Sequence, residues 1–288
     1  MKPDMVCGSS IGALVGAAYA SGQLDKLEKW CTGLAWTTVV RLMDLSWSGG
    51  LIRGARLFNL FNTILDDVEI DDLPVPYGAV ATELGSGREV WLRHGKMLDA
   101  VRASCAMPGI FRPAVRDGVL LVDGGLVNPV PVSMCRALGA DVVIAIDLSW
   151  GKLGVYRDRR REKRGDKGGD KSGDRDVLPD GTAEMPVAPR EVPGWLGKLG
   201  RGWLARAAKS VEEHHVKMPS ILEVFTTSLD IVEMRVARSR LAGDPADILL
   251  TPLLPGFRTM DFHRSKEAIE EGRFAVERMA PLIEQVIG

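Results

Sequence analysis

A serine between two glycines near the start of this 288-residue chain most limits the folds that the chain can adopt. The stretch Gly8-Ser9-Ser10-Ile11-Gly12 fits the pattern Gly-x-Ser-x-Gly and follows the apolar run Met5-Val6-Cys7. Small residues from Ser10 to Ser21 predict a helix, so the motif would lie on a sharp strand-to-helix turn. The flanking glycines would remove side-chain clashes there, and the helix N-terminus would favour a developing oxyanion. A turn of small residues also forms for packing reasons, so the pattern alone leaves both interpretations open.

A serine hydroxyl is a poor nucleophile without a base, so a base is expected beside Ser10. Of the four histidines, only His263 is a candidate for a catalytic triad, because His94 follows a strand at a turn and His214 and His215 lie among charged residues. Chain order disfavours a Ser-Asp-His hydrolase, since several strands precede the serine turn in that fold. Only nine residues precede this serine.

Asp123-Gly124-Gly125 offers a better candidate for the base. The β-rich run Val119–Val122 leads into this aspartate, and two glycines allow a sharp turn that leaves the carboxylate uncrowded. Such a carboxylate acts as a base when partial burial raises its pKa. The spacing fits an Asx turn at the strand exit equally well. Asp147, after the apolar run Val142–Ile146, is a rival carboxylate.

Predicted strands and helices alternate along the first 150 residues, which indicates an α/β layered domain. Tyr77–Leu84 and Glu89–Leu92 are expected to form one hairpin, and Asp117-Gly118 the turn of a second. The run Val142–Ile146 is continuously apolar, as in a strand buried on both faces.

Composition changes after Trp150. Residues 151–194 are expected to form a charged, disordered insertion, because Arg157–Asp176 contains no aromatic or β-branched residue that could enter a core. Residues 195–288 would then complete the domain with a helical segment, a helix over 219–237, a last strand and a C-terminal helix. Within 195–210, tryptophans and leucines alternate with basic residues. This pattern fits a helix on a membrane surface, or one packed onto the domain.

Charge and cysteine content exclude several classes of protein. Lys and Arg total 37 against 38 Asp and Glu, so the chain as a whole has no excess of positive charge that would attract nucleic acid. The four cysteines are widely spaced without a Cys-x-x-Cys pair, which argues against zinc and a disulfide framework. No signal segment or apolar run of ~18 residues is found. These features predict a cytoplasmic protein without a metal, with peripheral membrane contact through 195–210 as the alternative.

The chain resembles the patatin-like phospholipases, and among them the bacterial esterases related to neuropathy target esterase. The resemblance rests on Gly8–Ala13, on Val122-Asp123-Gly124-Gly125 with Asn128-Pro129 and Pro131, and on a connecting segment between them. That segment is Arg102-Ala103-Ser104 with Met107–Phe111 and Pro113. Similarity covers residues 3–148 and, more loosely, 245–287.

This resemblance implies a three-layer α/β/α fold with a mixed, mostly parallel sheet, in which residues 1–150 form the catalytic core. It implies a Ser-Asp dyad that hydrolyses fatty-acyl esters, with Ser10 as nucleophile, Asp123 as base and no cofactor. Gly8, Gly12 and the Ile11 N–H belong to the elbow, and Gly124 and Gly125 to the second motif.

The family also carries a first strand and a glycine-rich oxyanion loop upstream of the elbow, and this sequence begins after their position. We therefore expect a longer native N-terminus. The alternative is a weakened or inactive relative that binds lipid or a protein partner.

Overall fold

The computed structural model describes residues 2–34, 61–149, 221–257 and 261–288. Contacts divide the chain into two units, residues 1–163 with 225–288 and residues 164–224. Of the second unit, the structure describes only residues 221–224, at the start of a long helix. The fold described below is that of the first unit.

The sheets contain both parallel and antiparallel pairs. The first has the strands β1 (Val6–Ser9), β2 (Tyr77–Glu83), β3 (Glu89–Leu92), β4 (Ala114–Arg116) and β5 (Val119–Asp123). β1 runs parallel to β2, whereas β3 and β5 pair with β2, and β4 with β5, in antiparallel fashion. A second sheet joins β6 (Ile144–Ile146) to β7 (Ile248–Leu250) in parallel.

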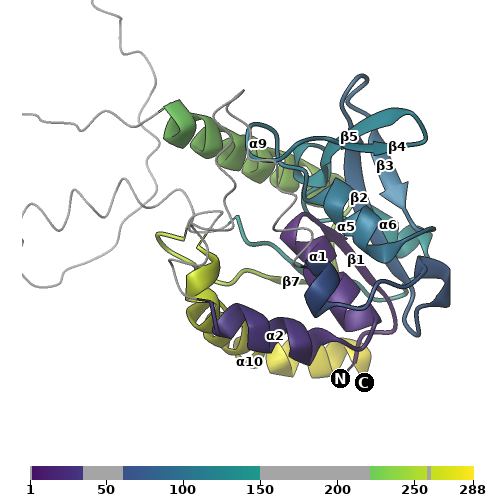
Figure 1. Cartoon of the computed structure of the whole chain (residues 1–288). Helices are drawn as coiled ribbons and strands as arrows, with labels where there is room; N and C mark the ends of the chain where they lie inside the picture. Colours follow the sequence, from purple (N-terminus) through teal and green to yellow (C-terminus); the bar gives the residue numbers. More distant parts are fainter. Residues whose placement is uncertain (1, 35–60, 150–220, 258–260) are drawn as a thin grey trace, which may run out of the picture. The chain divides into compact units, whose positions relative to one another are not determined.

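Figure 1 shows the helices around these strands. The α-helices are α1 (Ile11–Ala20), α2 (Leu24–Thr32), α5 (Met97–Ser104), α6 (Val132–Ala137), α9 (Ile221–Gly243) and α10 (Ser265–Ile287). Short 3-10 helices are η1 (Ile70–Asp72), η2 (Gly124–Leu126) and η5 (Phe262–Arg264). α2 and α10 contact each other, and Arg273 of α10 forms an ion pair of 3.4 Å with Glu28 of α2.

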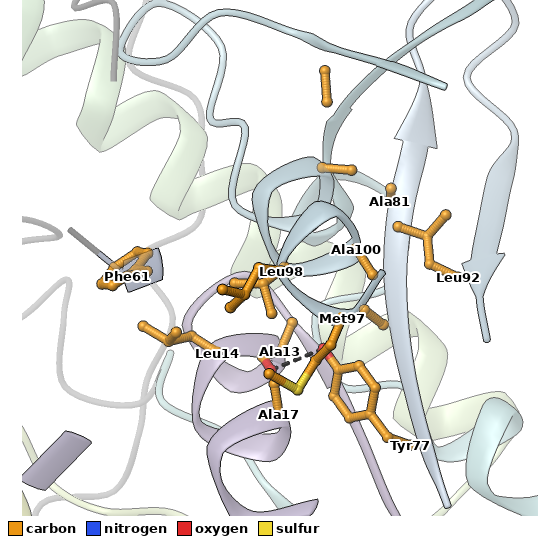
Figure 2. Packing of buried hydrophobic residues seen from close by; sticks show 14 of the residues in the cluster. Ala13, Leu14, Ala17, Phe61, Tyr77, Ala81, Leu92, Met97, Leu98 and Ala100 are labelled. Atoms are coloured by element: carbon orange, nitrogen blue, oxygen red, sulfur yellow. Dashed lines mark hydrogen bonds between the residues drawn. The ribbon is translucent and has the colours of Figure 1, made fainter. Parts of the chain in front are cut away.

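Alternating residues of β2 pack against helices on opposite faces. Tyr77, Ala79 and Ala81 belong to the main core with α1 and α5, and Figure 2 shows Tyr77 donating a hydrogen bond of 2.9 Å to the carbonyl of Ala13. On the other face, a side chain at Gly78 would collide with Met134 of α6. A sheet with helices on both faces confirms the expected α/β class.

The second hairpin predicted from the sequence is confirmed, because Asp117 (φ 51°) and Gly118 (φ 77°) form the turn between β4 and β5. Burial of Val142–Ile146 on both faces is wrong. The strand is only three residues long, and Ile146 at its exit is 56% exposed. The helix predicted over 219–237 extends to Gly243.

The charged segment 151–194 and the tryptophan-rich segment 195–210 lie outside the described residues. In the part of the chain that the structure describes, no helix has the length and apolar character needed to cross a bilayer.

Candidate active site

Ser10 connects β1 to α1 through a strained backbone. Its φ of 53° and ψ of −123° lie where non-glycine residues are rare, at a cost of about 1–3 kcal/mol. A Cβ atom at Gly8 would stand 2.3 Å from the Gly12 backbone, so the turn requires glycine there. A Cβ atom at Gly12 would meet no described atom within 4 Å other than its chain neighbours and the backbone of its own helix. The expectation that both glycines relieve clashes is therefore wrong for Gly12.

The Ser10 hydroxyl lies against the carboxylate of Asp123, at the end of β5. Ser10 Oγ donates a hydrogen bond of 2.6 Å to Asp123 Oδ2. The other carboxylate oxygen, Oδ1, accepts a hydrogen bond of 2.8 Å from the Gly125 N–H, and the aspartate is only 1% exposed. The Asx turn expected from the sequence is thus formed by Oδ1, whereas Oδ2 lies against the serine hydroxyl.

The two glycines after Asp123 allow the loop to pass close to neighbouring elements. A Cβ atom at Gly124 would lie 2.2 Å from the carbonyl oxygen of Val80 in β2. At Gly125 it would lie 2.9 Å from Oε1 of Glu233, which belongs to α9. Glycine at these positions therefore lets the sheet and α9 approach the Asp123 carboxylate.

Glu89 of β3 fastens the loop that follows Asp123. Its Oε1 accepts a hydrogen bond of 2.8 Å from Asn128, and its Oε2 forms an ion pair of 2.9 Å with Arg240 of α9. The same arginine donates through Nε to the carbonyl of Val127 at 3.0 Å. One largely buried carboxylate thus joins β3, the loop and α9.

The end of α5 reaches the backbone of Ser10. The N–H of Ser10 donates to Ser104 Oγ at 2.9 Å, and the Cys105 thiol donates to the carbonyl of Ser10 at 3.1 Å. Burial, and then the charge of Asp123, raises the pKa of the Cys105 thiol well above its ordinary value of 9.0. In the sequence, Ser104 belongs only to the connecting segment of the family resemblance, and nothing distinguishes Cys105. No local pattern indicates a contact across 94 residues.

The first turn of α1 presents donors close to Ser10. The carbonyl of Ser10 accepts from Ala13 and Leu14, as the start of a helix requires. The N–H groups of Ile11 and Gly12 donate to no acceptor among the described residues. Together with the positive end of the helix dipole, they favour a negatively charged oxygen at this point.

The other candidate residues have different surroundings. His94 Nδ1 lies within hydrogen-bond distance of Asp71 Oδ1, at 2.6 Å, and His263 lies in η5. Asp147 is buried and accepts a hydrogen bond of 2.8 Å from the Ser149 N–H. His214 and His215 lie outside the described residues. Across the described ranges, no group of three or more His, Cys, Asp or Glu side chains could hold a metal.

Comparison with known proteins shows which family this chain belongs to. The family model for patatin-like phospholipases matches residues 1–136. An uncharacterized NTE family protein of Mycobacterium tuberculosis is 33% identical over 289 residues, covering 93% of this chain and 80% of that protein. The chain belongs to the patatin-like phospholipase family.

The same family includes much longer animal proteins. Patatin-like phospholipase domain-containing protein 7 of Mus musculus is 32% identical over 277 residues, covering 93% of this chain but 18% of the mouse protein.

An uncharacterized NTE family protein of Mycobacterium bovis is 33% identical, with 93% of this chain and 80% of that protein covered. The patatin-like match ends at residue 136, so it contains Ser10, the end of α5 and Asp123.

Proposed function

We propose that this patatin-like protein is a serine hydrolase of carboxylic lipid esters, with Ser10 as nucleophile and Asp123 as general base. The observation that carries the proposal is the hydrogen bond of 2.6 Å from Ser10 Oγ to Asp123 Oδ2. In this direction the carboxylate is ready to accept the hydroxyl proton. The family name supports a lipid ester as the substrate class.

The proposed reaction has two halves. Ser10 Oγ attacks the ester carbonyl carbon while its proton passes to Asp123, and the carbonyl π electrons move to the oxygen as a tetrahedral oxyanion forms. Collapse of this intermediate breaks the bond to the alcohol, which leaves with the proton from Asp123. Water then attacks the acyl-serine, gives its proton to Asp123, and the fatty acid leaves as Ser10 regains its hydrogen.

The start of α1 supports stabilisation of the oxyanion. The N–H groups of Ile11 and Gly12 stand beside the nucleophile, and space beside the Gly12 Cα is clear of described atoms. Each such donor is typically worth about 10²–10³ in rate.

Labelling with a fluorophosphonate probe tests the proposal, because the probe bonds covalently to activated serines. We expect wild-type protein to be labelled and Ser10→Ala to lose the label. Ser21→Ala is the matched control, since it removes a side-chain hydrogen bond at the opposite end of α1. Unchanged labelling of Ser10→Ala would refute the assignment of the nucleophile.

Turnover of p-nitrophenyl acyl esters separates the proposal from its alternative, a weakened or inactive relative that binds lipid or a protein partner. Turnover by wild type that is lost in Ser10→Ala supports the hydrolase. A rate equal in wild type and Ser10→Ala supports the alternative.

Peripheral membrane contact through 195–210 remains a prediction, testable by liposome co-sedimentation with and without residues 152–210.

A further inference from the structure

Three consecutive residues, the last of α5 and the two that follow it, contact both members of the Ser10–Asp123 pair. Ser104 Oγ accepts from the Ser10 N–H at 2.9 Å, and the Cys105 thiol donates to the Ser10 carbonyl at 3.1 Å. The carbonyl of Ala106 accepts from the Asp123 N–H at 3.0 Å. The serine and the aspartate are 113 positions apart in the sequence. A segment of three residues therefore joins them directly.

Ser10 needs support of this kind because its conformation is strained. A backbone with φ of 53° and ψ of −123° persists only where its surroundings hold it. Helix α1 forms hydrogen bonds only with the carbonyl of Ser10, which accepts from the Ala13 N–H at 2.9 Å and from the Leu14 N–H at 3.3 Å. The Ser10 N–H precedes the helix and has no acceptor within it. Ser104 supplies that acceptor.

The surroundings favour both side-chain contacts. Ser104 is fully buried, so water does not compete for its hydrogen bond. The raised pKa of Cys105 keeps its thiol protonated, which makes it a donor toward the Ser10 carbonyl. A thiolate at that position would face both this carbonyl oxygen and the negative charge of Asp123.

We infer that Ser104-Cys105-Ala106 is a positioning segment, which holds Ser10 in its reactive conformation and sets its place relative to Asp123. This inference rests on the proposed function and deepens it. Without the Ser104 contact, the backbone of Ser10 relaxes toward an ordinary conformation. The hydroxyl then spends less time aligned with the carboxylate, although the substrate binds as before.

The test compares Ser104→Ala and Cys105→Ala with the control Ser21→Ala. The limiting rate of fluorophosphonate labelling is measured at saturating probe and expressed per titrated active site, together with the half-saturating concentration and the unfolding temperature. We expect Ser104→Ala to lower the limiting rate about tenfold with the half-saturating concentration unchanged. A thiol is a weak donor, so Cys105→Ala lowers the rate about threefold. Cys105→Ser, which restores a donor, recovers it.

A purely structural role would give a different result. It would lower the unfolding temperature and the number of titrated sites, but each remaining site would react at the wild-type rate. That outcome for Ser104→Ala would overturn the inference.

Amide hydrogen exchange at Ser10 provides a readout that does not need activity. We expect exchange to be at least about tenfold faster in Ser104→Ala than in wild type, and unchanged in Ser21→Ala. If wild-type protein shows no labelling that depends on Ser10, the proposed function fails, and exchange alone decides whether Ser104 holds this backbone. Unchanged exchange in Ser104→Ala would then overturn the inference.

Discussion

Asparagine at position 123 removes the proposed base while preserving the shape of the side chain. In Asp123→Asn the amide oxygen can keep the 2.8 Å contact of Oδ1 with the Gly125 N–H. The amide nitrogen then replaces Oδ2, which stands 2.6 Å from Ser10 Oγ in the native chain. Because this nitrogen is a donor, it cannot accept the hydroxyl proton.

The expected loss of activity follows from the role of the carboxylate. A general base typically contributes about 10²–10⁴ in rate, which corresponds to about 3–5 kcal/mol of activation free energy. Stability should change far less, because two opposing effects accompany the substitution. The hydrogen bonds to an ionised acceptor become weaker, whereas the cost of burying a charge at a position 1% exposed disappears.

Hydrolysis of p-nitrophenyl esters and thermal unfolding measure the two effects separately. Asp117→Asn is the matched control, because it makes the same change in the turn that leads into β5, where Asp117 has a φ of 51° that asparagine tolerates. We expect near wild-type activity for this control. If Asp123→Asn retained more than about a tenth of wild-type activity, the assignment of Asp123 as the base would be refuted.

Two further predictions concern stability. Gly8→Ala should lower the free energy of unfolding by about 3 kcal/mol or more, because its Cβ meets backbone atoms at 2.3 Å, whereas Gly12→Ala should be neutral or stabilising by up to about 1 kcal/mol. The Val143 N–H and then Arg136 lower the pKa of Asp247 below its ordinary value of 3.8. The ionised Asp247 carboxylate therefore stabilises the fold at pH values above 3.8, and this stabilisation is lost as the pH falls through the lowered pKa. The difference in unfolding temperature between wild type and Asp247→Asn should thus shrink from pH 7 to pH 3.

Urea unfolding of the glycine pair and thermal scans at the two pH values check these expectations. Equal unfolding free energies for Gly8→Ala and Gly12→Ala would contradict the steric argument. A temperature difference for Asp247→Asn that stays constant, or grows, toward low pH would contradict the linkage argument.

Local signals in the sequence located most elements near the site. Asp117-Gly118 predicted a turn because few residues adopt positive φ, and the structure gives both residues that conformation. Small residues after Ser10 predicted α1 at the position where the structure has it. The true end of α9 was missed, since its last turns carry Arg240, whose contacts with Glu89 and Val127 are tertiary.

The contacts that complete the site depend on chain segments far apart, so local patterns did not indicate them. Cys105 has no sequence environment that distinguishes it from a core cysteine, and only the fold brings its thiol to the Ser10 carbonyl. Glu233 reaches Gly125 from another helix across more than a hundred residues. For Gly12 the local pattern was misleading. The Gly-x-Ser-x-Gly motif suggests that a side chain at this position would clash, but no described atom outside its own helix stands in the way.

The divided use of the Asp123 carboxylate limits which acid can stand at that position. Its two oxygens reach a backbone amide two residues ahead and a hydroxyl on another element at the same time. A glutamate has the same charge, but its extra methylene would push the carboxylate past one of these contacts. The loop therefore requires a carboxylate on a side chain of aspartate's length, and Asp123→Glu is not a conservative exchange.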